Sequence, residues 1–149
     1  MVLEHSLKNT GSLRIETSVY NHNFLIMDGQ APGPGLTMAT PFTIETPRPP
    51  NKELAEVSGK QLAYVKTLSG KDVVSFPVQG FSGSAEDHQI KIENSKLKLG
   101  MSITGDKRMQ SANLWSIRSV MAIEPFVAVA VEPGSEFTWK TTYRYYTLP

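Results

Sequence analysis

The chain has 149 residues, of which 40% are hydrophobic, and 15 basic residues balance 14 acidic ones. This length and composition suit one globular domain over residues 1–149 and exclude wholesale disorder. A net charge of +1, with no Lys/Arg run longer than two, argues against a nucleic-acid partner. The chain has no cysteine, which excludes disulfides, thiolate catalysis and Cys-ligated metals.

Targeting signals and metal motifs are not apparent in the sequence. The opening segment Met1-Val2-Leu3-Glu4-His5 is not a signal peptide, and no apolar run approaches membrane-spanning length. We therefore expect a cytoplasmic protein without a membrane partner. The three histidines, His5, His22 and His88, lack the spacing of a metal motif, so we expect no metal.

Apolar and polar residues alternate with a period of two along most of the chain, which predicts β-strands. In the second run, Leu13, Ile15 and Val19 would share one face of a strand. Strands are expected near residues 2–8, 13–20, 36–45, 62–67, 73–78, 88–93, 97–103, 117–123, 126–131 and 137–145.

Turn-forming residues separate these runs. Only residues 51–59 could form a turn or two of helix, with Asn51 as the cap. Pro47-Arg48-Pro49-Pro50 predicts a stiff loop that cannot continue a sheet ladder. Hairpin-like connections are expected at four short segments, namely residues 9–11, 94–96, 105–107 and 133–135.

The last two strands have distinct patterns. Residues 126–131 are continuously apolar, which is typical of a strand covered on both faces. In the final strand an aromatic face is expected, formed by Phe137, Trp139, Tyr143 and Tyr145. About ten strands at roughly 8–12-residue spacing predict an all-β fold, an antiparallel β-sandwich.

The first polar cluster is Tyr20-Asn21-His22-Asn23-Phe24, where two amides flank an imidazole at a strand end. Asn side chains can fix the tautomer of a histidine, and they also hydrogen-bond hydroxyl groups. Asn21 and Asn23 are therefore candidate ligand-binding residues beside His22. The alternative is a solvated turn that carries a surface histidine.

The second polar cluster is Ile123-Glu124-Pro125-Phe126, where one carboxylate lies between two apolar stretches. Pro125 favours extended geometry at Glu124 and removes one backbone donor. Glu124 would then line a cleft, where it could act as a general base, or it would be exposed at a junction between two strands.

Three further residues could bind a sugar. Asp87, in Glu86-Asp87-His88, could accept hydrogen bonds from hydroxyl groups. Trp115 could stack on a pyranose face, although such a tryptophan is more often part of the core. Arg118 could bind a ring hydroxyl. A small-molecule sugar is thus the ligand that the polar residues favour.

Taken in order, these segments resemble the aldose 1-epimerase (galactose mutarotase-like) superfamily. Leu7-Lys8-Asn9-Thr10-Gly11 is similar to a strand and turn of the family, and His22 falls in its Asn-His motif. Asp87-His88 resembles the segment with a substrate-binding aspartate, and Glu124 the catalytic glutamate. Residues 132–139 resemble the closing hairpin.

The resemblance covers only the C-terminal half of such proteins, which are about twice as long. It implies that Glu124 is the base and His22 the acid that interconvert the anomers of a sugar, with no cofactor. Both groups would then face one hollow of the size of a sugar ring.

The missing half normally contributes an arginine and another histidine. The chain would accordingly be a fragment, or a small standalone relative that closes its sandwich by itself or by pairing with a second copy as a homodimer. A separate N-terminal half is the other partner that we expect. Two other functions stay open, a non-catalytic carbohydrate-binding sandwich and a structural or assembly module that binds no sugar.

Overall fold

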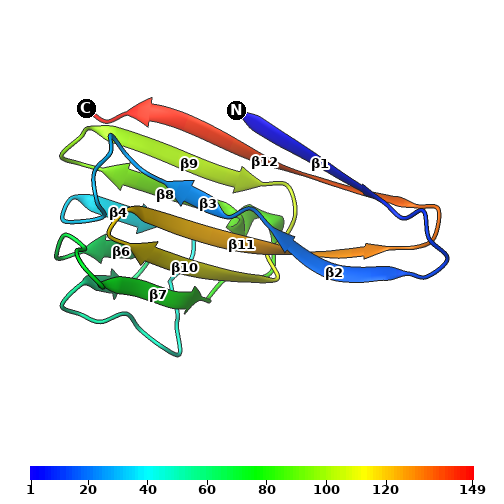
Figure 1. Cartoon of the computed structure of the whole chain (residues 1–149), viewed down its shortest axis with the longest axis horizontal. Helices are drawn as coiled ribbons and strands as arrows, with labels where there is room; N and C mark the ends of the chain where they lie inside the picture. Colours follow the sequence, from blue (N-terminus) through cyan, green and yellow to red (C-terminus); the bar gives the residue numbers. More distant parts are fainter.

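The computed structural model describes residues 1–149, which form two stacked antiparallel sheets (Figure 1). The larger sheet has the strand order β1-β12-β9-β8-β4-β6-β5, and the smaller has the order β2-β11-β10-β7, with β3 also paired to β11. The strands are β1 (Val2–Lys8), β2 (Ile15–Tyr20), β3 (Asn23–Leu25), β4 (Leu36–Ala39), β5 (Ala55–Ser58), β6 (Gln61–Tyr64), β7 (Val73–Val78), β8 (Gln89–Asn94), β9 (Leu99–Gly105), β10 (Ser111–Ile117), β11 (Val120–Val131) and β12 (Glu136–Thr147). A short 3₁₀ helix, η1 (Ala85–Asp87), precedes β8.

The core lies between the two sheets. Alternate residues of each strand point inward, so Ile92 and Ile103 of the larger sheet face the same interior as Leu114 and Ile123 of the smaller. The cluster contains 22 buried residues. The all-β antiparallel sandwich expected from the alternation is confirmed.

The structure holds no helix with the length and apolarity needed to cross a lipid bilayer.

Several local expectations were wrong. Residues 51–59 do not form a helix, because Asn51 caps a single turn that leads directly into β5. Leu13 lies outside β2 and is 80% exposed. Tyr145 does share a face with buried Tyr143, because the two pair with the inward residues Met101 and Ile103, but it is 66% exposed. In β11, Ala128 and Ala130 are exposed, so residues 126–131 are covered on one face only.

Three of the four expected hairpins are connections between the sheets. Only residues 94–96 join strands that pair directly, β8 and β9, whereas residues 9–11, 105–107 and 133–135 carry the chain from one sheet to the other. Asn9 links two of these crossings. Its backbone pairs with Ser135 and Gly134, and its buried side-chain amide donates to the carbonyls of Leu13 (2.8 Å) and Val131 (2.9 Å).

The edge of β11 is covered by two short strands in one register. Tyr20 of β2 pairs with Phe126, and Asn23 of β3 pairs with Ile123. Residues 21–22 between them interrupt the ladder and lie opposite Glu124 and Pro125. Since proline has no N–H to donate, it is an expected place for such a break. Glu124 therefore lies inside the continuous strand β11 rather than at a junction of two strands.

We expect Gly105→Ala to destabilise the fold. A Cβ at this position of β9 would lie 2.1 Å from Nδ1 of the buried His88 ring, so ring and strand must separate. Overpacking of this kind costs about 1–3 kcal/mol of unfolding free energy, which urea denaturation measures. Gly11→Ala is the matched control, because its Cβ would meet only Asn9 Oδ1 at 3.4 Å. Equal loss of stability in the two variants would contradict the packing argument.

Candidate functional site

His22 and Glu124 meet on the outward face of the smaller sheet. Nδ1 of His22 lies 2.8 Å from Oε1 of Glu124, and the two side chains are 41% and 12% exposed. The interruption between β2 and β3 places His22 beside the middle of β11, where Glu124 is an outward residue between inward Ile123 and Pro125. Local alternation and one break in pairing thus bring together residues a hundred positions apart.

The contact defines which atoms remain free for a ligand. A carboxylate oxygen accepts, so Nδ1–H donates to Oε1, and Nε2 of His22 and Oε2 of Glu124 are left over. The groups share one face, as the family resemblance requires, but they touch, and no sugar ring lies between them without separating the pair. Nowhere in the chain do three His, Cys, Asp or Glu side chains lie close enough together to hold a metal ion.

Aromatic rings surround the pair. The ring of His22 lies 4.0 Å from that of Phe24, 5.8 Å from Tyr20 and 6.1 Å from Trp115, measured between centroids. Ala122 of β11 pairs with Phe24 of β3 on one side and with Trp115 of β10 on the other. The two large rings therefore flank one small residue. Trp115 is therefore an outward residue next to His22 rather than part of the core.

Asn113 extends the polar row on the other side of Glu124. It is the register partner of Glu124 on β10, and it lines a hollow of about 170 Å³. This hollow is smaller than the roughly 300–1,000 Å³ typical of drug-sized ligands, which favours a single small ring. Its walls are formed by Arg48, Pro49, Ser75, Phe76, Pro77 and Asn113.

Arg48 reaches the hollow from a stiff loop. Thr46 Oγ1 accepts from the backbone N–H of Arg48 (3.3 Å) and donates to its carbonyl (3.2 Å), and prolines stand on both sides. The guanidinium is exposed and has no carboxylate partner. Sequence reasoning missed both Arg48 and Asn113. Prediction of a strand over 111–117, paired with the Glu124 segment, would have indicated Asn113, but no local signal indicated Arg48.

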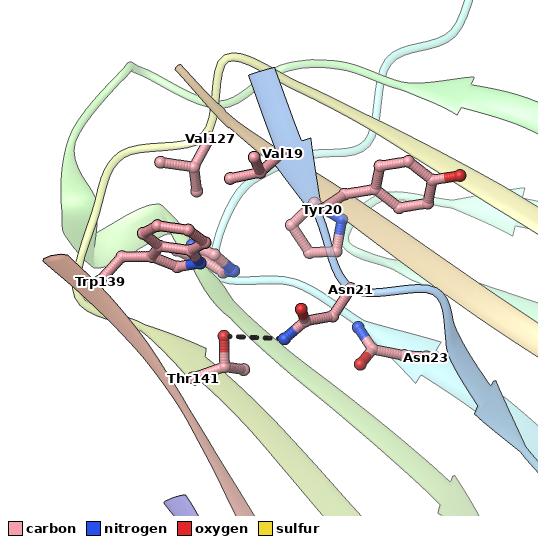
Figure 2. Close-up of a pocket in the computed structure, with 9 residues that line it drawn as sticks. Val19, Tyr20, Asn21, Asn23, Val127, Trp139 and Thr141 are labelled. Atoms are coloured by element: carbon pink, nitrogen blue, oxygen red, sulfur yellow. Dashed lines mark hydrogen bonds between the residues drawn. The ribbon is translucent and has the colours of Figure 1, made fainter. Parts of the chain in front are cut away.

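Asn21 and Asn23 point away from this face and into the space between the sheets (Figure 2). Asn21 Nδ2 lies 3.4 Å from Thr141 Oγ1 of β12, as Figure 2 shows. Asn23 Nδ2 donates to the carbonyl of Ile123 at 3.0 Å, and its Oδ1 accepts from the hydroxyl of Tyr143. The cavity that both amides line has a volume of about 10 Å³, which is too small for a sugar.

The remaining two sequence candidates have no contact with His22 or Glu124. The carboxylate of Asp87 accepts from the backbone N–H of Ser82 (2.5 Å) and its hydroxyl (2.7 Å), so it braces its own loop. Arg118 is an exposed residue of the two-residue turn between β10 and β11.

His88 is a buried histidine with a structural contact. Its ring is packed between the sheets, where Nδ1–H donates to the carbonyl of Lys107 at 2.9 Å. Burial lowers the pKa of His88 below its ordinary value of 6.5, against the opposing effects of the Lys107 carbonyl and of Asp106. The folded protein thus favours the neutral ring.

This shift predicts a loss of stability in mild acid. The folded-state pKa lies below the unfolded one, so the unfolded chain binds the extra proton first. The stabilisation is complete above about pH 6.5 and declines as the pH falls below it. We expect His88→Asn, which cannot titrate, to flatten the decrease of unfolding free energy between about pH 6.5 and 5, measured by urea denaturation. An unchanged slope would contradict the assignment to His88.

Comparison with known proteins supports the fold. No family model and no curated protein matches the sequence. Three similar solved structures are the Slr1438 protein of Synechocystis sp. PCC 6803 (16% identity, TM-score 0.64), a candidate aldose 1-epimerase of Klebsiella pneumoniae (18%, 0.65) and a GalM/aldose epimerase homologue of C. elegans (12%, 0.60).

The chain has the fold of aldose epimerase homologues. The three matches cover 98%, 97% and 99% of this chain, but only 50%, 42% and 56% of the other chains, in the same order. The chain thus spans about half the length of these solved structures. The resemblance found in the sequence is confirmed at the level of fold, while the roles of the site residues stay predictions.

Proposed function

We propose that this protein is a mutarotase-like aldose epimerase that interconverts the anomers of a cyclic sugar by general acid/base catalysis. The observation that supports this proposal most is the His22–Glu124 contact, on an open face bordered by aromatic rings. The contact occurs in a fold shared with aldose epimerase homologues. We assign the reaction to the cytoplasm as part of the same proposal, because a cysteine-free chain suits a reducing compartment.

The proposed mechanism uses the atoms that the contact leaves free. The anomeric hydroxyl and the ring oxygen of an aldose are bonded to the same carbon, so the base and the acid that serve them can be neighbours. Oε2 of Glu124 takes the proton of the anomeric hydroxyl, and Nε2–H of protonated His22 gives one to the ring oxygen. The bond between the ring oxygen and the anomeric carbon breaks, and a carbonyl forms.

Ring closure reverses these transfers. The bond to the new carbonyl carbon rotates, and the ring hydroxyl attacks the other face of that carbon while His22 takes the hydroxyl proton back. Glu124 gives its proton to the former carbonyl oxygen, which becomes the anomeric hydroxyl, and both residues return to their starting states. Each well-placed proton transfer contributes roughly 10²–10⁴ in rate.

The rest of the sugar would extend toward the hollow beside Asn113. The Asn113 amide can bind hydroxyl groups next to Glu124, and the half-buried ring of Trp115 offers an apolar surface for ring carbons. Arg48, whose charge is unpaired, would donate to hydroxyl groups at the far end of the hollow.

A second candidate function is recognition of carbohydrate without catalysis. The chain spans only half of the solved structures it matches, and Asp87 is engaged by Ser82 of its own loop. Both observations favour a site that binds with fewer groups than a complete enzyme. Saturable sugar binding without faster anomer exchange would identify this function, and an assembly module would bind no sugar at all.

Glu124→Gln tests the catalytic proposal. Loss of the base should lower the rate of anomer interconversion of freshly dissolved glucose and galactose, followed by polarimetry, by about 10²-fold or more. Glu56→Gln is the matched control, because this exposed glutamate lies in β5 at the far edge of the larger sheet. Parent and Glu124→Gln proteins with equal rates, or a parent no faster than buffer, would rule out the enzyme.

Arg48→Met tests the hollow. A hydrogen bond from a charged group contributes about 1.5–3 kcal/mol, so the KM for the sugar, or its Kd in a binding protein, should rise about 10-fold or more. Arg144→Met, which removes an exposed and unpaired arginine from β12, is the control. Unchanged KM and Kd for Arg48→Met would show that the hollow does not hold the ligand.

A further inference from the structure

The two long margins of the sandwich differ. Beside β5 and β7, a connecting segment closes the margin. The backbone N–H of Ile44 donates to Gly59 at the β5–β6 turn (2.8 Å), and that of Glu45 to Gln79 after β7 (3.0 Å). Phe42 and Ile44 of this segment are buried in the core. This margin therefore needs no partner.

The opposite margin is open. It consists of β1 in the larger sheet and of β2 with β3 in the smaller one, and β1 runs along the border of the molecule outside β12 (Figure 1). The inward face of β1 is incompletely covered, since Leu3 is 37% exposed. His5 on the same face stacks on Trp139 of β12 at 4.9 Å.

The outer backbone of β1 is free to pair. Met1 and Tyr143 exchange two backbone hydrogen bonds, and Asn9 donates to Ser135, so odd-numbered residues of β1 bond to β12. The N–H and C=O groups of Glu4, Ser6 and Lys8 consequently point outward. No proline or bulge protects this seven-residue edge, which makes it competent to pair with another strand.

The side chains of β1 are self-complementary. When a second copy pairs antiparallel about Ser6, Glu4 lies opposite Lys8 of the second copy, and Lys8 opposite Glu4 of the second copy. Both charged side chains are exposed and make no ion pair within the chain. The same register uses the outward backbone groups of Glu4, Ser6 and Lys8, and it brings His5 opposite Leu7 of the second copy.

We infer that two copies of this chain form a symmetric dimer through antiparallel pairing of their β1 strands, which joins the two seven-stranded sheets into one. The similar solved structures are about twice as long as this chain, and a second copy would supply a chain of equal length. The inference is independent of the sugar site, because β1 contributes none of its residues.

The test measures the oligomeric state of residues 1–149 by analytical ultracentrifugation over roughly 1–100 μM, the range in which modest interfaces dissociate. We expect a dimer. Ser6→Pro removes an outward N–H without breaking a backbone hydrogen bond to β12, and it should give a monomer. It also removes the hydrogen bond from the Ser6 hydroxyl to Glu136 of β12, so Ser6→Ala, which keeps the N–H, is its control and should stay a dimer. Lys8→Glu places like charges opposite each other twice and should raise the dimer Kd about 10-fold or more.

A charge exchange provides the matched rescue. Glu4→Lys combined with Lys8→Glu restores opposite charges in the same register and should restore the dimer. Circular dichroism and urea denaturation verify that each variant is folded. A parent protein that stays monomeric throughout the range would overturn the inference. So would a dimer that both Ser6→Pro and Lys8→Glu leave intact, because it would use another surface.

Discussion

The candidate site depends on the two-residue interruption between β2 and β3. Residues 21–22 keep the register of the neighbouring strands but do not pair with β11, and this freedom lets the ring of His22 bend over the outward face to Glu124. Pro125 lies opposite the interruption and has no donor to offer, so the break leaves fewer unpaired backbone groups than it would elsewhere. The geometry of one acid/base pair thus follows from where a proline falls in a central strand.

Hydrogen bonds on the inward side of the same interruption hold it in place. Asn23 binds the Ile123 carbonyl and the Tyr143 hydroxyl, and Asn21 reaches Thr141, so polar side chains replace part of the lost ladder. Burial raises the pKa of Tyr143, which keeps its phenol a neutral donor to Asn23. These amides hold the backbone that carries His22, and they do so from the opposite side of the sheet.

Alternation in the sequence was sufficient for the fold class, because it is a local property of each strand. The expectation that His22 and Glu124 share one face came from the family resemblance and not from alternation. Alternation also predicts that the two neighbours of an outward histidine point inward. The expectation that Asn21 and Asn23 bind a ligand beside His22 did not take this into account. The composition of a turn does not indicate whether the two strands that it joins pair with each other. Residues 9–11 and 133–135 have the composition of hairpin turns, yet they cross between sheets, because strand pairing is decided by distant segments. Arg48 reaches its hollow only through the path of a long loop, which no local pattern encodes.

The hydrogen bonds of Asn9 have a consequence for motion. The buried Asn9 amide ties the β1–β2 connection to the β11–β12 connection at the far end of these four strands. The Asn9 backbone also pairs with residues of the β11–β12 connection. The outer halves of these four strands extend together beyond the shorter strands (Figure 1). None of them can fray without releasing Asn9, so this projection opens as a single cooperative unit, and amide exchange along its strands shares one opening event.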